Sequence, residues 1–349
     1  MKYLSVCSGI EAATVAWHHM GWQPVAFSEI ERFPSQVLAY HYPDVPNVGD
    51  MTKFKEWNLG SVDLLVGGTP CQSFSVAGLR KGLDDPRGNL MLTYLAIAKQ
   101  YRPKWLVWEN VPGVLSSNGG NDFATFLRGM GQCGYGFAYR VLDAQYFGVA
   151  QRRRRVFVVG CLGDWRRSAA VLFERESLSG NPAPSREKRE EVSKTLTRGI
   201  SQRFDAETET KIPVALAENT IGRQPENGGN GDGFTIGGPM YTLNATGVHG
   251  VAQPISFHVD AMPDQMNFNT ETSASLTCSQ HAGIATQMAV RRLTPVECER
   301  LQGFPDNYTN IPWRKQSESP DSPRYKSLGN SMAVPVMKWI GERIQKVNL

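Results

Sequence analysis

Cys71 occupies a position in the sequence that suits a nucleophile. It follows residues 67–70, Gly-Gly-Thr-Pro, which come directly after the apolar run 62–66. Such a run predicts a buried parallel strand, and in an open α/β sheet ligands bind beyond the carboxyl ends of the strands. A thiolate attacks carbon well, but a buried cysteine is usually a small apolar side chain. This segment alone leaves both interpretations of Cys71 open.

Glu109 offers an acid to go with that nucleophile. It follows the apolar run 105–108, which predicts another buried strand. A carboxylic acid at a neighbouring strand end can protonate a ring nitrogen. Thiolate attack at C6 of a cytosine, with Glu109 assisting at N3, makes C5 nucleophilic enough to accept a methyl group. In isolation, Glu109 is better explained as an acid at the N-terminus of a helix.

The run Gln151-Arg152-Arg153-Arg154-Arg155 precedes the apolar segment 156–159. Side chains alternate along an extended backbone, so we expect Arg153 and Arg155 on one face and Arg152 and Arg154 on the other. One pair is placed to line the site and to bind a base and a phosphate, and the other to be surface charge. The strand that follows directly makes a flexible targeting signal a poor explanation.

The first loop, residues 8–12, has the position of a nucleotide-cofactor loop. It follows the predicted strand 2–7 and opens a helical stretch, and Glu29, 20 residues beyond Gly9, ends the second strand, where an acid holds ribose hydroxyls. Glu11 stands at the second glycine position of a dinucleotide-binding motif and would repel a pyrophosphate. S-adenosylmethionine, which lacks phosphate, therefore fits better than NAD, and Asp50 is placed to accept from its adenine amino group.

Composition excludes several classes of protein. Of the 349 residues, 41% are hydrophobic and 20% are charged, as in soluble globular proteins, and no apolar run spans a bilayer. The six cysteines are scattered without a CxxC pair, which argues against a zinc or disulfide framework and for a reducing compartment. A zinc deaminase also acts on cytosine, but the H-x-E motif and the second cysteine that it needs are missing here. We therefore expect no metal.

The pattern of apolar runs predicts a doubly wound, mostly parallel α/β sheet with a second, smaller, irregular β-rich domain. Strands are predicted at 2–7, 24–27, 62–66, 105–108, 139–142 and 155–160, with helices at 12–20 and 90–100. From about 165 the apolar runs disappear, and Gly, Asn, Thr, Ser and Pro dominate. We expect residues 1–165 and 289–349 to form the first domain and residues 166–288 the second.

Ordered patterning returns near residue 291. Thr294, Pro295 and Glu297 predict a helix start, with Thr294 as the N-cap and Pro295 at the first helical position. A final helix is predicted over 330–344, with Pro335 in its first turn or at its start. Residues 165–288 hold 11 lysines and arginines and 14 acidic residues, a net charge of −3, so the rest of the chain carries +7. The basic surface therefore belongs mainly to the α/β part.

Taken together, these motifs resemble the DNA (cytosine-5) methyltransferase family of bacterial or phage type. The resemblance covers most of residues 1–165 and 289–349, and the motifs stand in the family's order: the Gly9 loop, Glu29, Asp50, 67–75, Glu109-Asn110-Val111, Gln151-x-Arg153-x-Arg155, Arg291-x-Leu293-Thr294-Pro295-x-Glu297, 301–305 and Gly329-Asn330-Ser331-x-x-Val334-Pro335. One such motif alone is a weak signal, whereas the ordered set is specific. Glu11 and Cys7 depart from the pattern, because the family usually has a glycine and an aromatic residue there.

The resemblance implies a role for each matching residue. Cys71 is the expected nucleophile and Glu109 the partner of N3, while Arg153 and Arg155 position a flipped cytosine. The residues expected to hold S-adenosylmethionine are Cys7, Gly9, Ile10, Glu29, Ile30, Asp50, Met51, Pro70, Leu90, Asn330 and Ser331. Residues 73–89 resemble a loop that closes over DNA, and 166–288 stand in the place of a target recognition domain.

The implied activity is methyl transfer to C5 of a cytosine in a specific sequence of double-stranded DNA. RNA cytosine-5 methylation and a non-catalytic DNA-binding accessory protein are the alternatives. We expect a monomer without a membrane anchor, in the cytoplasm of a bacterium or of a phage-infected host. A restriction endonuclease is a possible partner.

Overall fold

The computed structural model describes residues 1–70, 89–173, 214–216, 234–236, 250–258 and 282–348. Cys71, the predicted closing loop before residue 89 and most of the predicted recognition domain therefore lie outside the described residues. Within the described ranges, no helix combines the length and the apolar character needed to cross a membrane.

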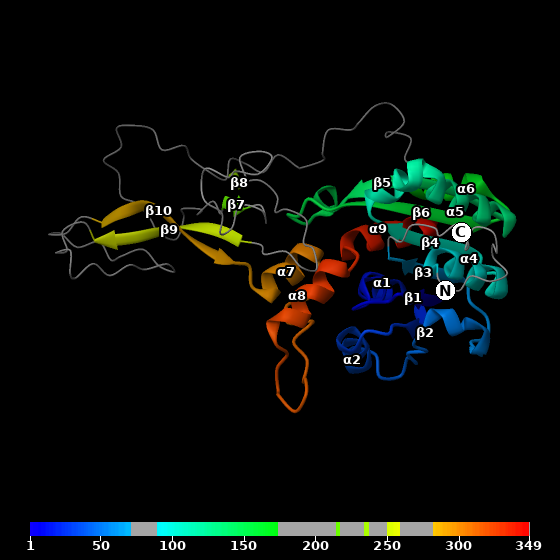
Figure 1. The fold of residues 1–349 in the computed structure, drawn as a ribbon, viewed down its shortest axis with the longest axis horizontal. Coiled ribbons are helices and arrows are strands. Elements are labelled where there is room, and N and C mark those ends of the chain that lie inside the picture. The colour runs from blue at the N-terminus through cyan, green and yellow to red at the C-terminus, as the bar shows by residue number, and fades with distance from the viewer. Residues whose placement is uncertain (71–88, 174–213, 217–233, 237–249, 259–281, 349) are drawn as a thin grey trace. The chain divides into compact units, whose positions relative to one another are not determined.

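A six-stranded sheet forms the centre of the first part of the chain (Figure 1). Its strands are β1 (Lys2–Val6), β2 (Gln23–Ser28), β3 (Leu64–Gly68), β4 (Trp105–Asn110), β5 (Tyr135–Asp143) and β6 (Arg154–Leu162), in the order β2-β1-β3-β4-β6-β5. The first four strands are parallel, and β6 is antiparallel to both neighbours. The prediction of a mostly parallel α/β sheet is thus confirmed.

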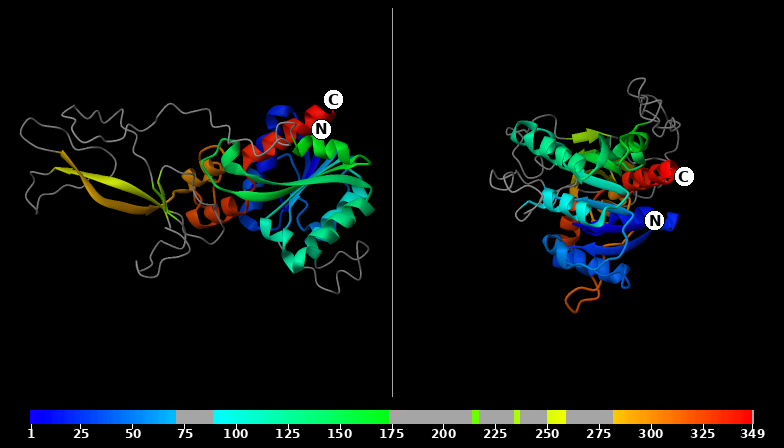
Figure 2. Two further views of the ribbon diagram at one scale, coloured as in Figure 1. Left: turned by 90° about the horizontal axis from the view of Figure 1, so that it is seen from above. Right: turned by 90° about the vertical axis from the view of Figure 1, so that its right-hand side faces the viewer.

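Helices cover both faces of this sheet, as Figure 2 shows most clearly in its right-hand view. On one face lie α4 (Leu90–Tyr101) and α5 (Asn121–Gln132), and on the other α1 (Ala12–Trp17), α6 (Trp165–Leu172) and α9 (Val334–Asn348). All six residues of β4 are buried, which explains the apolar run 105–108 that precedes Glu109 and Asn110. On the face of α4 and α5, Trp108 packs against Phe126 with ring centroids 4.2 Å apart.

Three longer helices and five short 3-10 helices complete the helices of the described residues. They are α2 (Arg32–His41), α7 (Pro295–Gln302) and α8 (Asp321–Asn330), with short 3-10 helices η1 (His18–Met20), η2 (Met51–Glu56), η4 (Pro112–Leu115), η5 (Ser117–Gly120) and η6 (Ala144–Phe147). Pro295 begins α7, as the sequence predicted.

The final helix begins later than predicted. Asn330 ends α8, Ser331 is extended with ψ 154°, and α9 begins only at Val334, so Pro335 lies in its first turn. The prediction of one helix over 330–344 is therefore wrong for residues 330–333, because Asn330 belongs to α8 and 331–333 are not helical, whereas the predicted place of Pro335 in the first turn is correct. Proline suits the first turn of a helix because its missing N–H has no partner there, and the break before it leaves Asn330 and Ser331 at the pocket described below.

Four further strands pair antiparallel in the order β10-β9-β7-β8: β7 (Val214–Leu216), β8 (Phe234–Ile236), β9 (Gly250–His258) and β10 (Ala282–Arg292). The chain divides into two compact units, Met1–Ala183 with Thr242–Thr246 and Pro295–Leu349, and Pro184–Tyr241 with Gly247–Thr294. The first unit extends beyond residue 165 because α6 packs on β5, β6 and α9.

Candidate active site

Glu109 lies near the carboxyl end of β4 and is almost entirely buried, at 9% exposure. Its Oε1 is 3.0 Å from Nε of Arg155 on the antiparallel neighbour β6. Burial raises the pKa of the Glu109 carboxyl, whereas Arg155 and Arg153 lower it. Burial and the two arginines thus shift the pKa of Glu109 in opposite directions, an environment that suits a group that exchanges a proton.

The four arginines alternate as predicted: Arg153 and Arg155 point inwards, and Arg152 and Arg154 are exposed. The guanidinium of Arg153 donates to the carbonyl oxygens of Gly329 (3.1 Å) and Ser331 (2.6 Å). Arg153 thereby ties the start of β6 to the end of α8. The two inward-pointing arginines therefore have different partners. Arg155 contacts the Glu109 carboxylate, and Arg153 donates to the backbone on either side of Asn330.

The end of β3 is fastened to the end of β4. Trp108 donates from Nε1 to Oγ1 of Thr69 (3.0 Å), and Asn110 donates from Nδ2 to the Thr69 carbonyl (2.9 Å). Gly68 makes room for the acid, because a Cβ there would lie 2.7 Å from Oε2 of Glu109. The polypeptide therefore enters Pro70 and Cys71 from a fixed point beside the Glu109 carboxylate.

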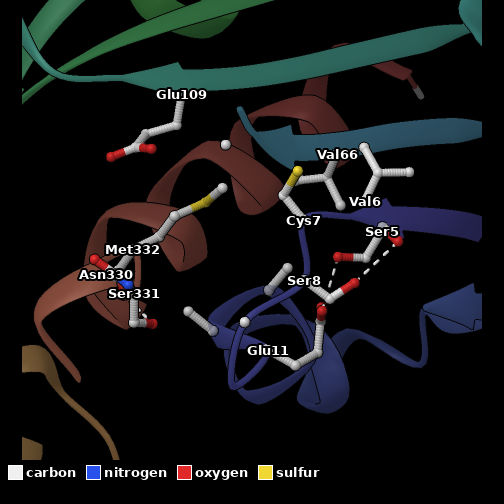
Figure 3. Close-up of a pocket in the computed structure, with 14 residues that line it drawn as sticks. Ser5, Val6, Cys7, Ser8, Glu11, Val66, Glu109, Asn330, Ser331 and Met332 are labelled. Atoms are coloured by element: carbon white, nitrogen blue, oxygen red, sulfur yellow. Dashed lines mark hydrogen bonds between the residues drawn. The ribbon is translucent and has the colours of Figure 1, made fainter. Parts of the chain in front are cut away.

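A pocket opens between the ends of β1, β3 and β4 and the end of α8 (Figure 3). Glu109 and Met332 lie on one side of it, and the loop from Cys7 to Glu11 lies on the other. The lining residues are Ser5, Val6, Cys7, Ser8, Gly9, Glu11, Ala12, Ala13, Val66, Gly68, Glu109, Asn330, Ser331 and Met332. None of these is a lysine or an arginine, and the acidic side chains among them are Glu11 and Glu109.

Several residues predicted to hold a cofactor lie around this pocket without lining it. Oε2 of Glu29 accepts from the Gly9 N–H (2.8 Å), and Oε1 accepts from the Glu31 N–H (2.7 Å). Oδ1 of Asp50 accepts from both the N–H and the hydroxyl of Thr52, each at 2.9 Å. The two carboxylates are thus fixed in place before any ligand binds.

The predicted apolar contacts differ in their exposure. Ile30 is 72% exposed, whereas Ile10 is completely buried and Met51 is 4% exposed. The thiol of Cys7 lies 3.4 Å from the Met51 sulfur, and burial, helped by Glu29 and Asp50, raises its pKa to about 12. Leu90 is half-buried at the start of α4, and Pro70 is exposed. Ile30 is thus the predicted apolar contact that presents most surface to a ligand.

Glu11 takes a conformation that the sequence did not reveal. Its φ is 65°, which L-residues other than Asn, Asp and Gly rarely adopt, and its carboxylate turns under the loop. It accepts from the Ser5 hydroxyl (2.7 Å), the Thr14 N–H (3.2 Å) and the Thr14 hydroxyl (3.1 Å). Burial raises its pKa to about 7. The acid thus caps α1 and stabilises the loop from inside.

Ser5, Ser8, Ala12, Ala13 and Met332 line the pocket although the sequence analysis did not select them. Their neighbours in the motifs at 8–12 and 329–331 are the signal that points to them. Across the described part of the chain, no group of three His, Cys, Asp or Glu side chains is arranged to hold a metal ion.

A family model described as C-5 cytosine-specific DNA methylase matches residues 1–346. The Type II methyltransferase M1.ScrFI of Lactococcus lactis subsp. cremoris is 30% identical, over 99% of this chain and 78% of that protein. A protein of Escherichia phage P1 named DNA N-6-adenine-methyltransferase is 38% identical, over 99% of this chain and 61% of its own length. This chain therefore spans less than two thirds of the phage relative.

The crystal structure of the S. pombe Dnmt2 methyltransferase has a similar fold. It superposes with a TM-score of 0.58 over 100% of both chains, at 16% sequence identity. At that identity the likeness concerns the fold.

Proposed function

Since this chain belongs to the family of C-5 cytosine-specific DNA methylases, we propose that it transfers a methyl group from S-adenosylmethionine to C5 of a cytosine in a specific sequence of double-stranded DNA. The observation that supports this most directly is the buried Glu109 carboxyl, paired with Arg155 and lining the same pocket as the loop from Cys7 to Glu11. The strand next to Glu109 leads directly to Cys71.

The pocket fits a cofactor that is cationic and lacks phosphate. Its lining carries no basic side chain that could bind a pyrophosphate, and Glu29 and Asp50 beside it add two carboxylates that would repel one. We assign Glu29 to the ribose hydroxyls, Asp50 to the adenine amino group and the exposed Ile30 to the adenine face. Bound S-adenosylmethionine supplies an electrophilic methyl group. Cys7, Gly9, Ile10, Met51, Pro70, Leu90, Asn330 and Ser331 complete the proposed binding set.

The residues of the chain divide the reaction among them. The Cys71 thiolate adds to C6 of the cytosine while Glu109 donates a proton to N3, which places an electron pair on C5. After C5 has gained the methyl group, loss of its proton and departure of the Cys71 sulfur restore the C5–C6 double bond. Arg155 holds the Glu109 carboxyl, and Arg153 holds the backbone at Gly329 and Ser331.

C6 is shielded in a stacked duplex, so the target cytosine must be flipped out, at a cost of about a few kcal/mol. We assign the reading of the target sequence to residues 166–288. We assign the general electrostatic attraction to DNA phosphates to the rest of the chain, which carries a net charge of +7, because residues 165–288 carry a net charge of −3. In this proposal Cys71 and residues 73–89 meet the extruded base.

A second candidate, methylation of adenine N6, rests on the printed name of the phage P1 relative. An exocyclic amine carries its own lone pair and needs neither a thiolate nor an acid at a ring nitrogen. The juxtaposition of Glu109 with the strand leading to Cys71 favours cytosine. The experiment described next also distinguishes this proposal from RNA cytosine methylation and from a non-catalytic accessory role.

Nucleoside mass spectrometry tests the proposal. The full chain is incubated with S-adenosylmethionine and either duplex DNA or transfer RNA, and 5-methylcytosine and N6-methyladenine are quantified. We expect 5-methylcytosine in DNA, no detectable product with Cys71→Ala, and a loss of about 10²–10⁴-fold with Glu109→Gln. Product only in RNA, only N6-methyladenine, or undiminished 5-methylcytosine with Cys71→Ala would each refute it. A covalent adduct with DNA containing 5-fluorocytosine identifies the attacking sulfur.

Type II methyltransferase names among the relatives support two finer proposals, a paired restriction endonuclease and action on the DNA of a bacterial or phage-infected cell, in its cytoplasm. We further propose a monomer. Light scattering of the purified chain with and without DNA checks the last point.

A further inference from the structure

The chain makes a strained hairpin turn between Trp313 and Gln316. Each of these residues donates its N–H to the carbonyl of the other, at 3.0 and 2.9 Å. The two central residues, Arg314 and Lys315, have φ of 46° and 71°. Positive φ at both central positions defines a type I′ turn, which Asn-Gly normally occupies because other L-residues are strained there. Strain of this kind costs on the order of 1–3 kcal/mol and persists where the surrounding structure holds the turn in place.

Two guanidinium groups approach the ring of Trp313. Arg314 stands 5.3 Å and Arg32, at the start of α2, 5.6 Å from the ring centroid. The ring is itself fixed, since it is 8% exposed and packs edge-on against Phe33. An aromatic face that holds a guanidinium leaves its N–H groups directed outwards for a planar anion.

These cations have no internal counter-charge among the described residues. Arg32, Arg314 and Lys315 are exposed, and none forms an ion pair with a described carboxylate. The segment between α7 and α8 contains two acidic residues, of which Asp306 pairs with Arg300 and Glu318 is exposed. The surface formed by Arg32, Arg314 and Lys315, which we call the basic turn, therefore keeps an excess of positive charge over Glu318.

The basic turn stands at one end of α8 and the pocket at the other. Helix α8 runs from Asp321, just after this loop, to Asn330, which lines the pocket, and the loop projects beyond the helix in Figure 1. Ten helical residues span about 15 Å. That length corresponds to roughly four to five base-pair steps of duplex DNA.

We propose that the basic turn binds phosphates of the DNA duplex about five base pairs from the target cytosine. This inference rests on the proposed function, because it requires that the pocket receive a base from DNA. Arg314 and Arg32 would meet phosphate oxygens with their paired N–H groups, and Lys315 would act as a point charge. Such contacts carry no sequence information but fix the position of the duplex.

Replacing Arg314 and Lys315 by Asn and Gly, the residues that a type I′ turn favours, tests whether the basic turn binds DNA. Arg314→Asn with Lys315→Gly removes two charges and relieves the backbone, so the melting temperature rises by a few degrees. Fluorescence anisotropy with a 20-base-pair duplex should show binding weaker by on the order of tenfold near 0.1 M salt. The slope of log K against log salt should fall by about 1.8, or 0.9 for each lost phosphate contact.

Matched variants separate the turn from charge in general. Arg314→Gln should weaken binding more than Arg128→Gln, which removes an exposed cation from α5, and Glu318→Gln should strengthen it. With a duplex that ends three base pairs from the target on each side, the loss caused by the double variant should disappear. Unchanged affinity in the double variant, equal losses with Arg128→Gln, or a loss for an RNA hairpin without one for DNA would overturn the inference.

The outcome is independent of catalysis. The double variant should form 5-methylcytosine at the wild-type rate when DNA is saturating, because the basic turn touches no reacting group. A wild-type chain that binds DNA through the turn but forms no 5-methylcytosine contradicts the proposed function instead.

Discussion

Glu11 is a buried carboxyl that faces no cation among the described residues. Its surroundings are Glu29 at the end of β2, Tyr3 on β1, Tyr42 after α2 and Tyr308 after α7. Burial therefore raises its pKa, and hydrogen bonds from Ser5 and Thr14 offset only part of that shift. The loop that it stabilises is thus sensitive to pH in the neutral range.

The pKa of Glu11 is about 7 in the folded protein and 4.5 in a model peptide. Below pH 4.5 both states hold the proton. Between pH 4.5 and 7 only the folded state keeps it, so the Glu11 contribution to stability is lost as pH rises through 7. The full change is at most about 3 kcal/mol. Relative to wild type, Glu11→Gln should therefore gain stability between pH 5 and 8.

Urea unfolding at several pH values measures this gain. Glu56→Gln, at an exposed position in η2, provides the control and should follow the wild-type profile. A constant difference between Glu11→Gln and wild type across this range would show that Glu11 does not titrate there.

At the scale of the element, the end of β3 contains two glycines with different purposes. A Cβ at Gly67 would lie 2.6 Å from both the carbonyl oxygen and Cγ2 of Val6 on the adjacent strand. A Cβ at Gly68 would meet the Glu109 carboxylate at 2.7 Å and the Met332 methyl at 3.1 Å. Gly67 thus allows β3 to pair closely with β1, and Gly68 leaves room for the Glu109 carboxylate.

The two alanine variants should consequently affect different properties, stability in one case and activity in the other. Gly67→Ala should lower the free energy of unfolding by about 1–3 kcal/mol, because backbone cannot yield. Gly68→Ala should leave stability nearly unchanged and reduce kcat by about 100-fold, because the displaced Glu109 loses its position. Denaturant unfolding and methyl-transfer rates at saturating substrates measure both. Similar losses of stability in the two variants would contradict this assignment.

The elements that position the site were predictable where their apolar pattern was continuous. The runs ending at Val66 and Trp108 predicted β3 and β4, and the alternation of Arg153 and Arg155 with their exposed neighbours was confirmed. Pro335 correctly indicated the start of α9, but the separate helix α8 was missed, because the contacts of Arg153 that fix Gly329 and Ser331 come from a distant strand. Local sequence carries no signal of such a contact.

For the whole molecule, Tyr308 joins the C-terminal segment to the loop from Cys7 to Glu11. Its hydroxyl donates to the Ile10 carbonyl (2.9 Å) and lies 3.1 Å from the Tyr42 hydroxyl. Its ring stacks on His41 with centroids 4.1 Å apart. Residues nearly 300 positions apart thus shape the same loop.

Tyr308→Phe should remove the hydroxyl and leave the buried Ile10 carbonyl without its donor. We expect a loss of about 1–3 kcal/mol in unfolding free energy and weaker binding of S-adenosylmethionine by titration calorimetry. Tyr42→Phe is the matched control, because it spares the bond to Ile10, and its effects should be smaller. Equal losses in the two variants would refute a specific role for the Ile10 contact.

The sequence resemblance assigned residues 289–349 to the first domain, which stays a prediction, and it carried no information on the contacts that these residues make. Tyr308 and His41 belong to no motif identified beforehand, and their contacts arise only once α2 and the segment after α7 are packed together. Cys71 was selected from sequence and lies outside the described residues, so its place opposite Glu109 stays a prediction.

The contact of Trp17 with Met337 can form only late in synthesis on the ribosome. The indole N–H donates to a carbonyl 320 residues further along the chain, where α1 packs against α9. At about 5–20 residues per second, roughly 16–64 s separate the emergence of the two partners. During that interval α1 and α6 lack the helix that packs against both of them. This part of the molecule can therefore reach its final packing only after the last helix has been synthesised.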